Sequence, residues 1–254
     1  MQKPIAVVFL MLFLFVTASA KEKTILVVVA HPDDETAIGS VLVNQSRLGN
    51  KVFVLFATDG QSGTRVTNIP EGDALGKVRQ QESICALEKM GLQPPIFLSI
   101  DRLDTRNGVR SYLDGHQKLL TSLKGKISDI DPDLIITFGP DGDSHHSEHI
   151  VIGSAVTELL LREKWVDKYP LYYMAWTKQP DDDDSLGYVD KQYLNVKIEY
   201  SQEDENKALI ATRCYVSQFT SEEMQKEEER QKKETENTSY FRRFVVKKGM
   251  RKGF

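Results

Sequence analysis

The sequence predicts an α/β fold, a three-layer α/β/α sandwich around a mostly parallel, Rossmann-like sheet. Two observations lead to this prediction. Short runs of β-branched and aliphatic residues alternate with longer segments of helical spacing, which is typical of parallel βαβ units. The first run, TILVVVA at residues 24–30, is apolar almost throughout, as expected for a strand buried on both faces of such a sheet.

The expected elements follow one another along the chain. Apolar, β-branched runs predict strands at residues 24–30, 51–58, 95–100, 133–138, 171–176 and 194–200. Apolar residues at helical spacing predict helices at residues 36–48, 74–90, 112–130, 149–165 and 201–216. Gly49 and Gly91 mark the ends of the first two helices, because glycine readily adopts the left-handed conformation that ends a helix.

The amino-acid composition excludes several classes of protein and of binding partner. Hydrophobic residues make up 40% of the 254 residues and the formal net charge is −4, so the chain can bury a core and is not predicted to be disordered. The slight acidity argues against nucleic acid as a partner. Two cysteines exclude a disulfide-dense scaffold and a Cys-rich zinc fold. We expect Cys85 and Cys214 to be small buried residues within helices; a bridge between them is the alternative in an oxidising compartment.

Residues 1–20 have the layout of a secretory signal peptide. Lys3 gives a positive start, residues 5–16 are apolar, and the segment ends in small residues up to Ala20. The apolar run is shorter than the roughly 20 residues that span a bilayer. We expect cleavage near Ala20 and export to the periplasm or the extracellular space, with no stable membrane span. An uncleaved N-terminal membrane anchor is the alternative.

The remaining chain is expected to divide at residue 220. Residues 21–220 form the α/β domain, and residues 221–254 form a charged C-terminal extension that is helical or surface-associated. Residues 226–233 mix both signs of charge, as on a solvated helix. The basic residues near the end either contact an anionic surface or only solubilise the chain: Arg242, Arg243, Lys247, Lys248, Arg251 and Lys252.

Two clusters of histidine and acidic residues directly follow predicted strands. HPDDE at residues 31–35 follows the first strand, and DGDSHHSEH at residues 141–149 follows the fourth. Ligands of open parallel sheets bind beyond the carboxyl ends of the strands. Four of the five histidines lie in these two clusters; the fifth, His116, is expected to be an ordinary surface or core residue.

Imidazoles and carboxylates in this pattern suit a divalent cation that keeps one coordination position open. Such a cation lowers the pKa of bound water and polarises a carbonyl. Hydrolysis also needs a base and a donor to the oxyanion. Taken alone, the first cluster has an equally good explanation, a turn in which Asp33 or Asp34 caps the next helix.

The motifs resemble those of the PIG-L/LmbE-like family. AHPDDE at residues 30–35 is combined with GPDG at residues 139–142 and a His-x-x-His pair at His146 and His149. Thr58-Asp59-Gly60, Arg79-x-x-Glu82 and Ser217-Gln218 extend the similarity over residues 24–218. The resemblance implies a metal-dependent de-N-acetylase that acts on N-acetylglucosaminyl conjugates.

The resemblance also implies roles for single residues. His31, Asp34 and His149 match the metal ligands, with zinc as the expected metal and iron or another divalent ion as the alternative. Asp33 matches the general base, which deprotonates the metal-bound water that acts as nucleophile. His146 matches the residue that stabilises the oxyanion.

The second motif departs from the family pattern at three positions. Glu148 stands where the family usually has aspartate, and we expect it to orient the catalytic histidine, His146. Ser147 replaces the usual proline. His145 stands where glycine is frequent and is expected to add a substrate contact.

Two further residues are expected to bind substrate. The planar guanidinium of Arg79 can bind sugar hydroxyls or phosphate; the alternative is a helix salt bridge to Glu82. Asp101, together with Asp104, follows the third strand and either holds sugar hydroxyls or caps the following turn.

The leading hypothesis is a zinc-dependent hydrolase that removes the acetyl group from an N-acetylated amino sugar, on a small-molecule or glycan substrate. One alternative is a secreted glycan-binding module with an inactive site. Another is a zinc peptidase, because His145-x-x-Glu148-His149 also matches an inverted zinc-protease pattern.

Overall fold

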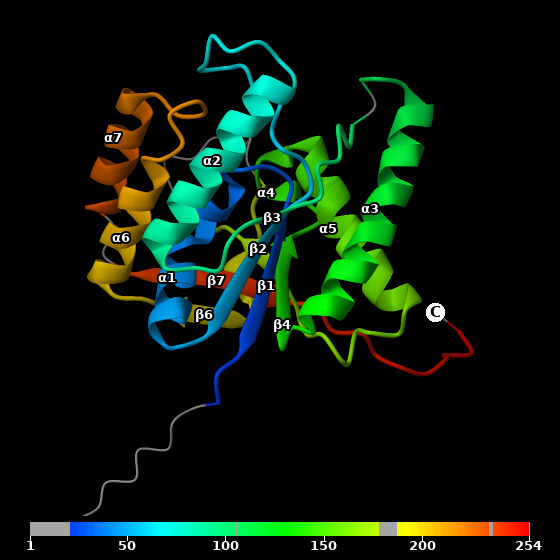
Figure 1. Cartoon of the computed structure of the whole chain (residues 1–254). Helices are drawn as coiled ribbons and strands as arrows, with labels where there is room; N and C mark the ends of the chain where they lie inside the picture. The colour runs from blue at the N-terminus through cyan, green and yellow to red at the C-terminus, as the bar shows by residue number, and fades with distance from the viewer. Residues whose placement is uncertain (1–20, 105, 178–186, 234–235, 254) are drawn as a thin grey trace, which may run out of the picture.

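A seven-stranded sheet in the order β3-β2-β1-β4-β5-β7-β6 forms the middle layer of the described part of the chain (Figure 1). This computed structural model describes residues 21–104, 106–177, 187–233 and 236–253. The expected signal peptide, residues 1–20, lies outside the described residues. The predicted α/β fold with a mostly parallel sheet is confirmed.

Five neighbouring strands are parallel and the last two pairings are antiparallel. The strands are β1 Thr24–Val29, β2 Lys51–Phe56, β3 Ile96–Phe97, β4 Leu134–Phe138, β5 Leu171–Ala175, β6 Val196–Glu199 and β7 Thr238–Arg243. The centre of the sheet is the parallel pair β1 and β4, which places the residues that follow both strands at the same edge.

Helices cover both faces of the sheet. On one side lie α1 Gly39–Arg47, α2 Asp73–Met90, α6 Gln202–Thr212 and α7 Ser221–Gln231, of which α1, α2 and α6 pack against one another. The other face carries α3 Val109–Ile130 and α5 Ser147–Arg162 (Figure 1). Short helical turns complete the chain: η1 Asp34–Ile38, α4 Gly142–His145 and η2 Lys191–Tyr193.

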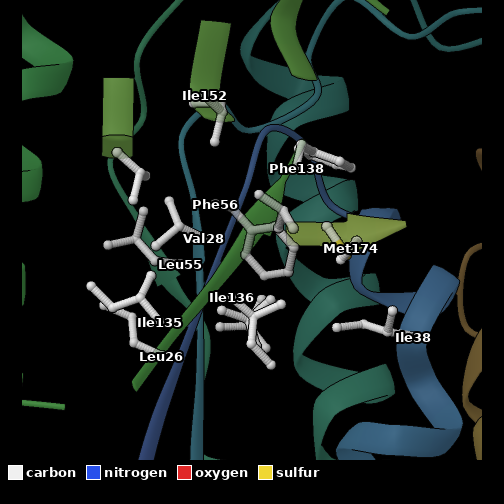
Figure 2. Packing of buried hydrophobic residues seen from close by; sticks show 14 of the residues in the cluster. Leu26, Val28, Ile38, Leu55, Phe56, Ile135, Ile136, Phe138, Ile152 and Met174 are labelled. Carbon is white, nitrogen blue, oxygen red and sulfur yellow. The ribbon is translucent and has the colours of Figure 1, made fainter. Parts of the chain in front are cut away.

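The core lies on both faces of the central strands. In Figure 2, Leu26 and Val28 of β1 lie on the side of Ile152 from α5, whereas Ile136 of β4 lies on the opposite side, toward Ile38. Residues 25–29 are at most 2% exposed. This burial explains why the first strand is a continuous apolar run, as expected for a central parallel strand.

The third strand is shorter than predicted. The sequence predicts a strand over residues 95–100, but only Ile96–Phe97 pairs with β2. Pro94 and Pro95 have no N–H to donate to a strand ladder. Ser99 has a φ of 50°, a left-handed conformation that interrupts the extended backbone of a strand.

The charged C-terminal extension contributes one helix and one strand. Its helical part is α7, whereas β7 was not expected from the sequence. β7 lies between β5 and β6, and its Phe241 is only 1% exposed. The alternation of apolar and polar residues that marks a strand is hard to recognise in β7, because basic residues follow Phe241.

Cys85 on α2 and Cys214 after α6 form a disulfide across 129 residues of sequence. The expectation that each is an unpaired buried residue is therefore wrong. Helical spacing predicts that each cysteine faces the interior but does not reveal which helices pack together. The contacts between α2 and α6 bring the two cysteines together.

No described helix is both long enough and apolar enough to cross a bilayer. The alternative of an N-terminal anchor concerns residues 1–20, which lie outside the described residues.

Candidate active site

The two predicted clusters meet at the carboxyl ends of β1 and β4, at the upper edge of the sheet in Figure 1. The rings of His31 and His146 lie 4.9 Å apart, those of His146 and His149 4.7 Å, and those of His31 and His149 5.4 Å. One ring nitrogen from each histidine lies within 4.8 Å of the other two. Three imidazoles from two distant segments therefore surround one point.

The carboxylate of Asp34 lies between two of these imidazoles. Its Oδ1 is 3.1 Å from Nε2 of His149, and its Oδ2 is 3.5 Å from Nδ1 of His31. Oδ2 also accepts hydrogen bonds from the backbone N–H groups of Ala30 and His31, at 3.0 and 2.7 Å. Burial favours the neutral acid, but His149 and His31 outweigh burial and hold the pKa of Asp34 below its usual range.

His149 is fixed by two contacts. Its ring stacks on Phe138 of β4 with a centroid distance of 4.0 Å. Its Nδ1 lies 3.1 Å from the carbonyl oxygen of Gly142 and donates to it, which leaves Nε2 facing Asp34. A side chain at Gly142 would place a Cβ only 2.6 Å from Ile150, so this position needs glycine for the close approach.

The electrostatics of the cluster favour a cation. Burial lowers the pKa of His31, but the carboxylates of Asp34 and Glu148 outweigh burial and raise it to about 10. An excess of carboxylate charge therefore faces the imidazoles. Imidazole nitrogens and carboxylate oxygens are suitable ligands for zinc and several other divalent metals. The donor set fits a divalent metal.

The carboxylate of Glu148 contacts His31 rather than His146. Its Oε2 lies 2.7 Å from Nε2 of His31, and its Oε1 accepts a 2.6 Å hydrogen bond from the backbone N–H of Leu103. Only the backbone N–H of Glu148 bonds to His146, donating to Nδ1 at 3.3 Å. The expected link to His146 is thus made by the amide that His146 caps at the start of α5, while the long side chain reaches across to His31.

Asp33 has an unusual backbone conformation. Its φ is 111°, which a residue with a side chain rarely adopts. Thr36 holds its carbonyl through the backbone N–H at 3.0 Å and Oγ1 at 2.7 Å. Burial raises the pKa of the Asp33 carboxyl well above its usual range, and the neighbouring Asp34 adds to the increase.

Arg79 is buried beside the site. It is 2% exposed and donates from Nη2 to the carbonyl of Gly63 at 3.0 Å. A Cβ at Gly60 would lie 2.7 Å from its Cδ, so the loop after β2 closes tightly over the guanidinium. Its positive charge opposes the rise in the Asp33 pKa. The alternative partner, Glu82, instead accepts hydrogen bonds from Ser217 at 2.8 and 2.7 Å.

A cleft of about 720 Å³ opens above the cluster. The expected site residues that line it are His31, Asp33, Asp34, Arg79, Asp101, His146, Glu148 and His149. Asp101 accepts a 2.5 Å hydrogen bond from Nε2 of Gln61, which also lines the cleft.

His145 is not brought into the site. It is exposed, has a φ of 57° and does not line the cleft. The substrate contact expected for it has no support in this geometry. The zinc-peptidase alternative is not favoured either, because it needs His145 and His149 as ligands of the same metal.

Sequence reasoning missed Arg65 and the part of the cleft wall that α7 provides. Arg65 bonds to both carboxylate oxygens of Glu223 on α7, at 2.5 and 3.3 Å, and donates to the carbonyl of Gln218 at 2.9 Å. Met224 of α7 lines the same cleft. Arg65 is an isolated arginine in a loop without a motif, so no sequence signal could have singled it out.

Comparison with known proteins supports the resemblance. The sequence model of the PIG-L family, GlcNAc-PI de-N-acetylase, matches residues 26–160. A 1D-myo-inositol 2-acetamido-2-deoxy-alpha-D-glucopyranoside deacetylase from Mycobacterium sp. (strain KMS) is 28% identical over 169 residues. The match covers 60% of this chain and 54% of that protein, so the chain aligns with about half the length of this relative.

Two solved structures share the fold at low sequence identity. The N,N'-diacetylchitobiose deacetylase from Pyrococcus horikoshii has a TM-score of 0.63 at 18% identity, covering 88% of this chain and 84% of that chain. The 4-carboxy-2-hydroxymuconate hydratase from Pseudomonas putida KT2440 also has a TM-score of 0.63, at 14% identity, covering 91% of this chain and 100% of that chain. The names of these two proteins describe different reactions, so the fold alone does not determine the chemistry.

The family assignment therefore rests on the sequence match together with the residues of the site. The matched region spans just over half of the chain and contains both clusters that meet at the strand ends. The chain belongs to the PIG-L family, whose description is GlcNAc-PI de-N-acetylase.

Proposed function

We propose that the chain is a metal-dependent hydrolase that removes the acetyl group from an N-acetylglucosaminyl conjugate. The observation that carries the proposal is the meeting of His31, Asp34 and His149 with Asp33 and His146 in one cleft. The relatives support it, because the family description and the Mycobacterium protein both name de-N-acetylation of an acetamido sugar.

His31, Asp34 and His149 would hold the metal. Zinc suits two imidazoles and one carboxylate, and iron or cobalt would also fit this set. When bound, such a metal lowers the pKa of water and polarises the acyl carbonyl.

Asp33 is the proposed general base. Its carboxylate lines the cleft next to Asp34 and takes the proton of the attacking water. A base works best when its pKa lies near the working pH. The burial that raises the pKa of Asp33 therefore favours this role.

His146 is the proposed donor to the oxyanion. Burial and the neighbouring His31 lower its pKa, which favours the neutral ring. Because Nδ1 accepts the backbone N–H of Glu148, the ring proton resides on Nε2. That N–H can donate to the oxyanion, and the proton that Asp33 has taken from the attacking water is available to the leaving amine.

We propose that the substrate is a glycan or small glycoconjugate met outside the cytoplasm. Asp101 would accept hydrogen bonds from sugar hydroxyls in the cleft, and Arg79 would bind a polar group of the substrate beside it. The signal-peptide pattern of residues 1–20 supports export. The Cys85–Cys214 disulfide also supports it, because disulfides persist mainly in oxidising compartments.

The test is acetate release by the purified mature chain loaded with zinc, on N-acetylglucosamine, its short oligomers and its inositol conjugates. We expect release from at least one substrate and its loss on adding a chelator. Zinc-loaded protein that binds these sugars and releases no acetate would contradict the proposal and favour the glycan-binding alternative.

A further inference from the structure

We propose that Tyr215 is a positioning residue that fixes the conformation of Asp33 by acting through Glu35. The proposal rests on the role of Asp33 proposed above. Tyr215 follows α6, far from both strand-end clusters in the sequence, and its hydroxyl reaches the residue that directly follows the HPDD segment.

Asp33 needs outside support for its backbone. Its φ of 111° lies in the region that favours glycine, and a residue with a side chain stays there only when its surroundings hold it. Thr36 holds the carbonyl of Asp33, as described above. The N–H is held separately, by the carboxylate of Glu35, which accepts it on Oε2 at 3.2 Å.

Glu35 is itself held by Tyr215. The Glu35 side chain is completely buried, and its second oxygen, Oε1, accepts the hydroxyl of Tyr215 at 2.5 Å. One carboxylate oxygen thus faces the backbone of Asp33 and the other faces Tyr215. Without the Tyr215 hydroxyl, only hydrogen bonds from the backbone hold this carboxylate, so Oε2 is less firmly placed against the N–H of Asp33.

Tyr215 is fixed on α2 from both sides. The preceding residue, Cys214, is bonded to Cys85 of α2, and Ser217 donates its N–H and hydroxyl to Glu82 of α2. The Tyr215 ring is completely buried and its hydroxyl lies 3.3 Å from Oγ of Ser83, also on α2. The turn after α6 therefore places the hydroxyl with little freedom, as a support for a catalytic geometry requires.

The experiment compares Tyr215→Phe with Tyr169→Phe in the full mature chain. Tyr169 is a matched control, because it is 1% exposed and donates its hydroxyl to Asp131 at 2.9 Å, at the opposite edge of the sheet. We expect Tyr215→Phe to lower kcat by about tenfold or more, because a small misplacement of a catalytic group can cost about 10²-fold. KM and zinc content should stay within about twofold of wild type, since the metal ligands and the substrate contacts are unchanged. Tyr169→Phe should lower stability and leave kcat unchanged.

Glu35→Gln provides a second variant. Glutamine keeps the size of the side chain but cannot offer an acceptor to both partners. Its loss in kcat should match that of Tyr215→Phe, and the double variant should be no slower than the worse single variant, because both act through the same contact. If Tyr215→Phe does not fold, Glu35→Gln alone is the test: a fall in kcat at wild-type KM and zinc content supports positioning of Asp33 through Glu35, and a wild-type kcat overturns it.

The outcomes separate the two proposals. If wild type is active, Asp33→Asn is inactive, and Tyr215→Phe and Glu35→Gln keep the wild-type kcat, positioning by Tyr215 is overturned and the proposed function stands. Equal losses of kcat in Tyr215→Phe and Tyr169→Phe also overturn it, since the effect is then one of general stability. If wild type releases no acetate, the proposed function fails, and the positioning role fails with it.

Discussion

Nε2 of His31 and Oε2 of Glu148 lie 2.7 Å apart, although 117 residues separate them in the sequence. The contact joins the cluster after β1 to the start of α5. The other oxygen of Glu148 accepts the N–H of Leu103, so the carboxylate is oriented from outside the site. A carboxylate that contacts a metal-binding histidine fixes its ring orientation and adjusts its basicity.

Glu148→Gln should therefore weaken the site without unfolding the protein. Glutamine preserves the length of the side chain and an acceptor for Leu103, but it loses the charge that faces His31. We expect metal affinity or kcat/KM to fall about 10- to 100-fold. Zinc titration and acetate-release kinetics on the same preparation measure the two quantities. Wild-type values for both would show that the contact has no functional role.

Asp33→Asn should separate metal binding from catalysis. Asparagine has nearly the same shape, but it cannot accept the proton of water. We expect kcat to fall about 10²- to 10⁴-fold, the usual contribution of a general base. Zinc content, measured by elemental analysis, should equal that of wild type because Asp34, His31 and His149 are untouched. Full activity would exclude Asp33 as the base.

The sequence predicted where the site forms better than how its residues interact. The rule that ligands bind beyond the carboxyl ends of parallel strands predicted that the two clusters meet, and β1 and β4 do pair. The partner of Glu148 could not be predicted in this way. The direction in which the side chain points depends on the turn at residues 142–146, whose backbone includes left-handed residues.

The sequence also could not predict contacts made by residues that belong to no recognisable motif. Tyr215 is a single tyrosine after a helix, and nothing in its neighbourhood indicates that it contacts Glu35. The pairing of Cys85 with Cys214 depends on how α2 packs against α6. Such contacts depend on tertiary packing, which local patterns do not encode.

His145 and His146 are adjacent and should behave differently. His146 lines the cleft and its ring lies 4.9 Å from that of His31, whereas His145 is exposed and does not line the cleft. We expect His146→Ala to lower kcat by about 10² or more through loss of the oxyanion donor. His145→Ala should keep zinc and activity within about twofold. Loss of zinc in His145→Ala would revive the zinc-peptidase interpretation.

Removing the disulfide should destabilise the protein. The bridge closes a long loop, with a separation of 129 residues, and disulfides of this kind typically contribute about 2–4 kcal/mol. The double variant Cys85→Ala/Cys214→Ala should lose that much free energy of unfolding in urea. A reducing agent should lower the Tm of wild type and leave the Tm of the double variant unchanged. Equal responses of the two proteins to the reductant would show that the bridge is absent in solution.

Asp204, at the start of α6, is expected to give the protein a measurable pH dependence of stability. Its side chain is 1% exposed. It accepts two hydrogen bonds from Arg47, at 2.8 and 3.0 Å, and closes a capping box with Ser201. The Arg47 contact lowers the pKa of Asp204, against an opposing contribution from burial, and Ser201 lowers it further.

The direction of the pH effect follows from this lowered pKa. The stabilisation is present above the unfolded pKa of about 3.9 and is lost as pH falls toward the lower folded pKa. Asp204→Asn should cost about 2 kcal/mol at pH 7, a moderate value because Arg47 is half exposed. Urea unfolding at pH 7, 5 and 3.5 should show a constant difference between wild type and variant down to about pH 5 and a smaller difference at pH 3.5. Glu199→Gln is the control, since its pair with Lys197 is exposed and screened by solvent, so the variant should keep close to wild-type stability at all three pH values. A difference for Asp204→Asn that grows as the solution becomes more acidic would contradict the assignment, because protonation of Asp204 can only remove what the charged carboxylate contributes.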